Sequence, residues 1–201
     1  MLQNFSVNWF LPRLRRFNEA FPNVEVRLSF EPHYVDFARE AIDMAVRHSP
    51  HDWPDLHCEL LFQDQLLPVC SKAYLAAHGP FDKPADLFRH TLLVSDGRPS
   101  DAWSEWFRST GTELGSELAT IHVDSSHLAM LAAANGIGFA IAGARLMQPM
   151  MRRGELVAPF PMTVPEHGSF FTVCPPGWAN RPKIRRMRRW LAEEARQTFD
   201  S

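Results

Sequence analysis

The chain has 201 residues, of which 45% are hydrophobic and 22% are charged, and its formal net charge at pH 7 is -2. This length can bury one large or two small cores, and the near-neutral charge argues against a nucleic-acid or membrane partner. No apolar run is long enough to span a bilayer and no signal peptide opens the chain, so we expect a cytoplasmic protein. Its three cysteines are far apart, so we expect them to be reduced and to form no disulfide. We also expect no metal and no cofactor.

A helix is predicted close to the amino terminus. Asn4 or Ser6 can cap it, since both side chains accept hydrogen bonds from free backbone N–H groups. Pro12 requires the regular helix to begin close to that residue, and Pro22 ends it. The elements expected next are a strand over 24–28, a helix over 34–41, a strand over 42–46 that ends in Arg47, a strand over 60–69, helices over 72–77 and 84–88, a strand over 90–94 and a helix over 102–110.

Residues 121–147 form one predicted strand–helix–strand unit. Residues 121–123 are strand-like, and a helix follows that stops at Asn135-Gly136, where the chain can take a left-handed conformation. Residues 137–142 are an apolar run containing Gly138, which is typical of a buried parallel strand. The elements expected after this unit are a helix that begins at Pro149 and stops at Gly154, a strand over 156–157, a proline-rich connection over 159–168, a strand over 169–173 and an amphipathic helix over 183–199.

Three polar residues, Asp124, Ser125 and Ser126, open the helix of this central unit. They lie at the carboxyl end of a strand, where open α/β sheets bind small and often anionic ligands. Helix capping alone would also explain them, and one hydroxyl can do both. With His127 they supply the residue types of a hydrolytic triad, but sequence neighbours cannot converge as a triad requires, so we expect no catalytic residue here.

Three other groups of residues have a structural explanation that we favour. The nine histidines are scattered without the spacing of metal ligands. The basic run over 181–189 could contact nucleic acid, but a solvated helix face explains it better. Trp103, Trp106 and Phe107 have helical spacing and are expected in a core rather than in an aromatic stacking platform.

Alternating strands and helices then predict an α/β protein with parallel sheets.

A series of short motifs runs through nearly the whole chain in a specific order. They are Asn4-Phe5, Leu11-Pro12-Arg13-Leu14, Phe21-Pro22-Asn23-Val24, Val35-Asp36-Phe37, Ile42-Asp43-Met44-Ala45-Val46-Arg47, Trp53-Pro54, Pro68-Val69-Cys70-Ser71, Ala85-Asp86-Leu87, His90-Thr91-Leu92-Leu93, Asp124-Ser125-Ser126, Ala132-Ala133-Ala134-Asn135-Gly136-Ile137-Gly138, Gly154-Glu155-Leu156-Val157, Val173-Cys174-Pro175 and Arg181-Pro182-Lys183. Together they resemble the effector-binding domain of bacterial LysR-type transcriptional regulators, and the nearest branch is the glycine-cleavage-activator group.

The resemblance implies a type II periplasmic-binding-protein-like fold, with two Rossmann-like subdomains joined by two crossing strands near 65–70 and 169–174. Regulatory subdomain I would comprise 1–69 and the returning strand and helix of 169–201, and subdomain II would comprise 70–168. The winged helix-turn-helix of the family is absent and the strand before Asn4 is short, so this chain is not expected to read operator DNA by itself. The resemblance also implies a homodimer that is tetrameric at full length.

The resemblance also implies an effector between the subdomains that controls transcription, and no enzymatic activity. A stand-alone solute-binding protein of the same fold is the alternative. The residues expected to bind the effector are Asn4, Ser6, Glu31 and Arg47 from the first subdomain, and Ser95, Asp124, Ser125 and Ser126 from the second. Two helix starts and one arginine favour a small carboxylate or amino acid.

Overall fold

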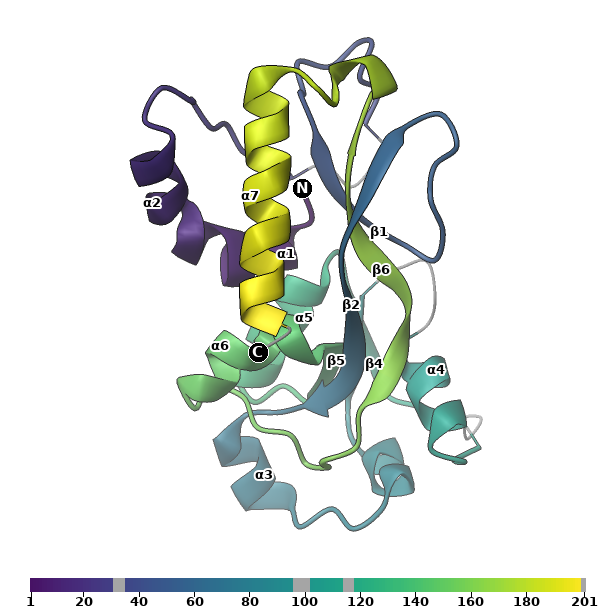
Figure 1. Cartoon of the computed structure of the whole chain (residues 1–201). Coiled ribbons are helices and arrows are strands. Elements are labelled where there is room, and N and C mark those ends of the chain that lie inside the picture. Colours follow the sequence, from purple (N-terminus) through teal and green to yellow (C-terminus); the bar gives the residue numbers. More distant parts are fainter. Residues whose placement is uncertain (31–34, 96–101, 114–117, 200–201) are drawn as a thin grey trace. The chain divides into compact units, whose positions relative to one another are not determined.

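The computed structural model describes residues 1–30, 35–95, 102–113 and 118–199 (Figure 1). The chain divides into two units. Unit 1 contains Met1–Asp64 and His167–Ser201, and unit 2 contains Gln65–Glu166. Two long strands, β2 (His57–Val69) and β6 (Val164–Cys174), each contribute residues to both units, so the chain passes from one unit to the other inside continuous strands.

Unit 1 combines one part of the six-stranded sheet with helices from both ends of the chain. The order of its strands is β1-β6-β2, and β1 runs antiparallel to β6 with a register from Ala45 opposite Val173 to Ser49 opposite Ser169. Figure 1 shows α7 (yellow) alongside these strands. The elements besides β2 and β6 are α1 (Gln3–Phe5), a π-helical turn η1 (Ser6–Phe10), α2 (Leu11–Ala20), β1 (Ala45–Ser49), a 3-10 turn η3 (Pro176–Trp178) and α7 (Pro182–Phe199).

Aromatic rings fill the core of unit 1. The ring of Phe62 on β2 stacks on Phe170 of β6 with centroids 4.6 Å apart and lies 4.3 Å from the ring of Phe199 on α7. At the edge of this core, Glu194 of α7 pairs with Arg13 at 3.6 Å and with Arg16. Because α2 carries both arginines, the ion pairs hold α2 and α7 together.

The first helix begins earlier than the capping argument predicted. Asn4 and Ser6 lie inside the helical run, and the N-cap position is Leu2, which has no side-chain cap. The regular helix α2 does begin next to Pro12, as expected, and a π-helical turn precedes it. Proline lacks the N–H that an α-helical turn would use, so a wider turn before it is physically reasonable.

Two predicted elements of unit 1 are wrong, and one is displaced. Residues 24–28 keep the alternation of half-buried and exposed side chains but form no ladder with any described strand. Of the predicted helix 34–41, the described part is only a turn, in which the Asp36 carboxylate accepts a hydrogen bond from the Ala38 amide at 3.0 Å. The predicted strand 42–46 is β1, which lies three residues later and has Arg47 at its centre.

Unit 2 has the strand order β2-β5-β3-β4. The sheet is mixed rather than parallel, because β3 runs parallel to β4 and β5 whereas β2 pairs with β5 antiparallel. Its other elements are α3 (Lys72–His78), a 3-10 helix η2 (Pro84–Arg89), β3 (Leu92–Ser95), α4 (Ala102–Ser109), β4 (Thr120–Val123), α5 (Ser126–Ala134), β5 (Phe139–Gly143) and α6 (Ala144–Arg152).

The predicted strand–helix–strand unit is confirmed as β4, α5 and β5. At the end of α5 the chain forms a Schellman motif, in which the amides of Gly136 and Ile137 donate to the carbonyls of Ala133 and Ala132 at 2.9 and 3.1 Å. Gly136 has a φ of +77°, which glycine adopts without a steric penalty. This turn sends the chain directly from α5 into β5.

Two boundaries after β5 differ from prediction. Helix α6 begins at Ala144 and contains Pro149, because Gly143 at the end of β5 is itself the N-cap and gives no polar capping signal. Strand β6 begins at Val164, inside the predicted connection, where buried and exposed side chains already alternate. Pro165 occupies an exposed position of that strand. The short strand predicted at 156–157 is a bridge in which the backbones of Cys70 and Val157 exchange two hydrogen bonds.

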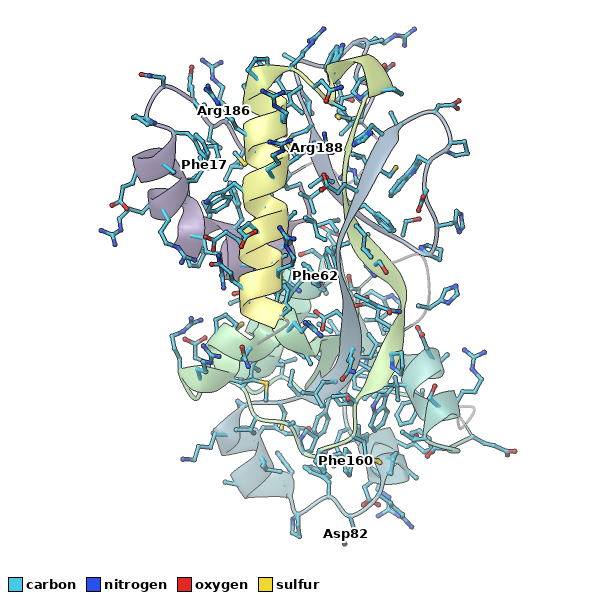
Figure 2. All side chains as sticks on the ribbon, viewed as in Figure 1. Phe17, Phe62, Asp82, Phe160, Arg186 and Arg188 are labelled. Carbon is cyan, nitrogen blue, oxygen red and sulfur yellow. The ribbon has the colours of Figure 1, made fainter. Side chains whose placement is uncertain are left out.

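The helix faces predicted to be buried are confirmed. Trp103, Trp106 and Phe107 of α4 are buried in the core of unit 2, where Phe160 also packs, and the described part of α7 buries Ile184, Met187, Leu191 and Ala195 (Figure 2). Among the described residues, no helix combines the length and the apolar composition that crossing a bilayer would need.

Candidate functional site

Four of the predicted site residues come together at the carboxyl ends of the neighbouring strands β3 and β4 in unit 2, which form one edge of the sheet. Strands β3 and β4 are parallel, and their register places Ser95 beside Val123. Both strands therefore end at the same edge, where Ser95 is the last residue of β3 and Asp124, Ser125 and Ser126 follow β4. Asp124 is exposed and the three serines are partly buried, so none of the four side chains is fully enclosed by the protein.

The start of α5 provides hydrogen-bond donors at this edge. Ser125 is the N-cap in an extended conformation, and its hydroxyl accepts a hydrogen bond from the Leu128 amide at 3.3 Å. The amides of Ser126 and His127 precede the first hydrogen bonds within the helix and point out of its end. Together with the positive end of the helix dipole, they favour an anion.

His127 also lies at this helix start. From the sequence it was not predicted to bind the effector. Its side chain is buried, and its Nδ1 atom has no hydrogen-bond partner among the described residues. Burial lowers the pKa of His127, so the imidazole is neutral at pH 7. The Ser125 hydroxyl accepts a hydrogen bond from the Leu128 amide, and the contacts recorded between described residues include none between Ser125 and His127.

In unit 1, Asn4 and Ser6 are both buried and hydrogen-bonded within the first helical turns. The Asn4 Oδ1 atom accepts a hydrogen bond from Asn8 Nδ2 at 2.7 Å, and the Ser6 hydroxyl donates to the Leu2 carbonyl at 3.0 Å. Asn8 was missed by the sequence argument, although its spacing of four residues from Asn4 is a signal that the two side chains can meet on a helix.

Arg47 lies in the middle of β1, opposite Phe171, rather than at the end of a strand. Only 7% of it is exposed, and a buried guanidinium is stable only when hydrogen-bonded or paired. Glu31, the remaining predicted site residue, lies outside the described residues. The structure thus brings Asn4 and Ser6 into adjacent helical turns and leaves Arg47 on a separate element of the same unit.

The described part of the chain was compared with the requirements of a metal site and of a reactive cysteine. No group of three or more His, Cys, Asp or Glu side chains that could hold a metal ion is found there. The three cysteines are free, and burial raises the pKa of the Cys70 thiol to about 11, so that thiol stays protonated at neutral pH.

Comparisons with known proteins agree on one group of relatives. The family model described as the LysR substrate binding domain matches residues 1–196. The chain is 33% identical to the glycine cleavage system transcriptional activator of Escherichia coli over 97% of this chain and 63% of that protein. It is 32% identical to the HTH-type transcriptional activator AmpR of Pseudomonas aeruginosa over 95% of this chain and 63% of that protein. The chain therefore spans just under two thirds of these curated relatives.

Solved structures give the same result. The AmpR effector binding domain from Citrobacter freundii matches with a TM-score of 0.86 and 25% sequence identity, over 98% of this chain and 96% of that one. The effector domain of AmpR from Pseudomonas aeruginosa matches with a TM-score of 0.84 and 30% identity, over 96% of this chain and 92% of that one.

Proposed function

This chain belongs to the LysR substrate binding domain family, has the type II periplasmic-binding-protein-like fold of that family, and is the effector-binding domain of a LysR-type regulator. From this premise we propose that it holds a small-molecule effector in the cytoplasm and that, within a longer regulator, the bound effector controls transcription from DNA held by an N-terminal helix-turn-helix. The relatives are transcriptional regulators. We propose accordingly that the chain binds its effector without transforming it.

The observation that supports an effector site most directly is the shared edge of β3 and β4. Ser95, Asp124, Ser125 and Ser126 offer hydroxyls and one carboxylate there, beside the free amides at the start of α5. Donors at a helix start suit a carboxylate, and Asp124 suits an ammonium group. A small carboxylate or amino acid is the effector class that we propose.

We propose that units 1 and 2 are the two regulatory subdomains of the family and that the effector also engages Asn4, Ser6, Glu31 and Arg47 of unit 1. Regulation then requires that the effector bind one arrangement of the subdomains more tightly than another, because a ligand shifts an equilibrium only by its difference in affinity. In the whole regulator this shift would change the placement of the DNA-binding domains.

Replacing Ser125 with alanine is expected to weaken effector binding about ten- to hundredfold. The substitution removes one hydrogen bond to a charged ligand, which contributes roughly 1.5–3 kcal/mol. Loss of the cap on Leu128 costs about 1 kcal/mol of stability, so the protein should remain folded. Calorimetric titration of the parent and the variant with a panel of carboxylates and amino acids measures the effect.

The matched control is Ser71→Ala. Ser71 is also an N-cap in unit 2, and its hydroxyl accepts a hydrogen bond from the Tyr74 amide at 3.1 Å. It caps α3, so its loss should cost similar stability and leave effector affinity unchanged. Equal effector affinity for the parent and Ser125→Ala would refute this placement of the site.

We further propose that the chain forms a homodimer, and a tetramer as part of the full-length regulator, through the faces of residues 8–21 and 127–135. Every residue of α5 after His127 is apolar, and Leu128 and Leu131 are each 41% exposed. Leu11 of α2 is 42% exposed. Both helices already bury other residues in the core, so these exposed leucines are additional apolar side chains. Exposed apolar side chains of this kind are typical of an interaction surface.

Sedimentation at high micromolar concentration is expected to show a dimer, and the double substitution Leu128→Glu and Leu131→Glu is expected to give a monomer, because it places charges in the contact. Leu60→Glu is the control, since Leu60 is 57% exposed on β2, outside the proposed faces. A monomeric parent protein under these conditions would contradict the proposal.

A further inference from the structure

The first half of α7 and the loop before it carry an unusual concentration of positive charge. Residues 181–189 hold six of the 21 lysines and arginines of the chain and no Asp or Glu. The sequence favoured a solvated helix face for this run. The structure separates the six cations into those with an intramolecular role and those without one.

Three of the six have partners in unit 1. Arg188 donates to Glu59 at 2.6 Å and to the Ala179 carbonyl at 2.9 Å, and Lys183 pairs with Asp43 at 2.8 Å. The Arg181 guanidinium lies 4.3 Å from the centre of the Trp178 ring. These contacts fix α7 and η3 against the rest of the unit, so they account for the presence of these residues.

Arg185, Arg186 and Arg189 have no such role. All three are exposed, and among the described residues none of them makes an ion pair or a side-chain hydrogen bond. Arg185 and Arg189 are one turn apart, so their side chains are neighbours. Arg185 and Arg186 also lie in the first turns of α7, where positive charge opposes the helix dipole. Their charges therefore tend to destabilise the helix rather than support it.

A groove of about 330 Å³ lies beside these arginines. Arg186 lines one side of it, and the other lining residues come from the end of α2 and the chain after it, namely Ala20, Phe21, Pro22, Asn23 and Val24. Figure 2 shows Arg186 and Arg188 on opposite sides of α7, with Arg186 on the side of Phe17 and α2.

The carboxylates next to the groove in sequence are engaged elsewhere. Glu19 pairs with Arg15 at 3.4 Å, and Glu25 pairs with Arg27 at 2.8 Å. The groove therefore combines apolar residues, among them Phe21 and Val24, with a guanidinium that makes no ion pair among the described residues. That combination is complementary to an apolar side chain flanked by carboxylates.

We propose that this groove and Arg185, Arg186 and Arg189 form a docking surface for an acidic peptide segment of a partner protein, with one apolar side chain in the groove. Arginine binds carboxylates through two parallel hydrogen bonds. A nucleic-acid backbone would satisfy the arginines but supplies no apolar group for Phe21, Pro22 and Val24. The surface shares no residue with the proposed effector site, and it shares only Ala20 and Phe21 with the faces proposed for the homodimer.

The test uses the whole chain and a fluorescently labelled peptide in which glutamates surround one central leucine. A second peptide has serine in place of leucine, and a short duplex DNA serves as the nucleic-acid probe. We expect the leucine peptide to bind at low salt at least about tenfold more tightly than the serine peptide, because burial of leucine is worth roughly 1.5–3 kcal/mol. Anisotropy titrations measure all three affinities.

The variant that removes the charges is Arg185→Gln, Arg186→Gln and Arg189→Gln. It should bind the leucine peptide at least about tenfold more weakly, since charge-assisted contacts are lost. Its melting temperature should be no lower than that of the parent, because the cations at the start of α7 oppose the helix dipole. The matched control neutralises Arg89, Arg108 and Arg152, three exposed arginines of unit 2, and should bind the peptide as the parent does.

Several results would overturn the proposal. Equal losses in the variant and its control would show that only total charge matters. Equal affinity for the leucine and serine peptides would remove the role of the groove. Tighter binding of duplex DNA than of the leucine peptide would assign the arginines to nucleic acid, and no binding of either peptide would leave a solvated helix face. None of these results bears on the effector affinity, which Ser125→Ala tests separately.

Discussion

Replacing Phe62 with alanine is expected to lower the free energy of unfolding by about 3–5 kcal/mol, the usual cost of removing a fully packed phenylalanine. Phe62 lies at the centre of the aromatic core of unit 1. Its ring contacts Phe170 and Phe199 with centroids 4.6 and 4.3 Å away, and the rings of Phe5 and Trp9 lie 6.4 and 6.5 Å away. These rings come from four separate elements, so the cavity left by the substitution cannot be closed by moving one of them.

Urea unfolding followed by circular dichroism measures this change as a lower midpoint. Leu60→Ala is the control on the same strand, because Leu60 is 57% exposed and should lose far less than Phe62, whose exposure is 6%. If the two variants were equally stable, the aromatic cluster would not be the main source of packing energy in unit 1.

The central unit of β4, α5 and β5 was predicted from the sequence to within a few residues. Its signals are local: Ser125 caps the helix through its own side chain, and Gly136 ends it through its own backbone conformation. The helix predicted over 72–77 is confirmed as α3, and the structure adds that Ser71 caps it. The amphipathic helix predicted over 183–199 is confirmed as α7. Where one or two neighbouring residues determine a boundary, the sequence is sufficient.

Elements that depend on distant partners were predicted less well. Residues 24–28 alternate as a strand does, but alternation describes one chain, whereas a strand also needs a neighbour to pair with. The placement of Arg47 depended on the limits of β1, which are set by its pairing with residues 169–173 of β6. The residues near Arg47 in the sequence do not indicate with which residues of β6 it will pair.

The candidate site shows the same division. Parallel pairing of β3 and β4 brings Ser95 next to the start of α5, as expected when two strands are each followed by polar residues. Asn4 and Ser6 were assigned to a helix start on residue type alone, and the helix begins before them. The buried imidazole of His127 gave no sequence signal, since burial depends on how α5 packs on the sheet.

Gly138 is a position where the sheet of unit 2 tolerates no side chain, and Gly138→Ala is expected to destabilise the protein by about 3 kcal/mol. A Cβ atom at residue 138 would lie 2.2 Å from the backbone oxygen of Thr91 and 3.0 Å from its carbonyl carbon. Backbone atoms cannot rotate away as a side chain can. The adjacent Phe139 amide donates to the same Thr91 oxygen at 2.9 Å, so relieving the clash also breaks the hydrogen bond between the first residue of β5 and Thr91, the residue before β3.

Thermal and urea unfolding of Gly138→Ala measure the loss, with Gly177→Ala as the control. A Cβ atom at residue 177 meets nothing within 4 Å, so that variant should unfold like the parent. Because β3 ends at Ser95, separation of β3 from β5 should also displace the sheet edge and weaken effector binding in the protein that remains folded. Parent-like stability of Gly138→Ala would mean that Thr91 and β5 are farther apart than the structure places them.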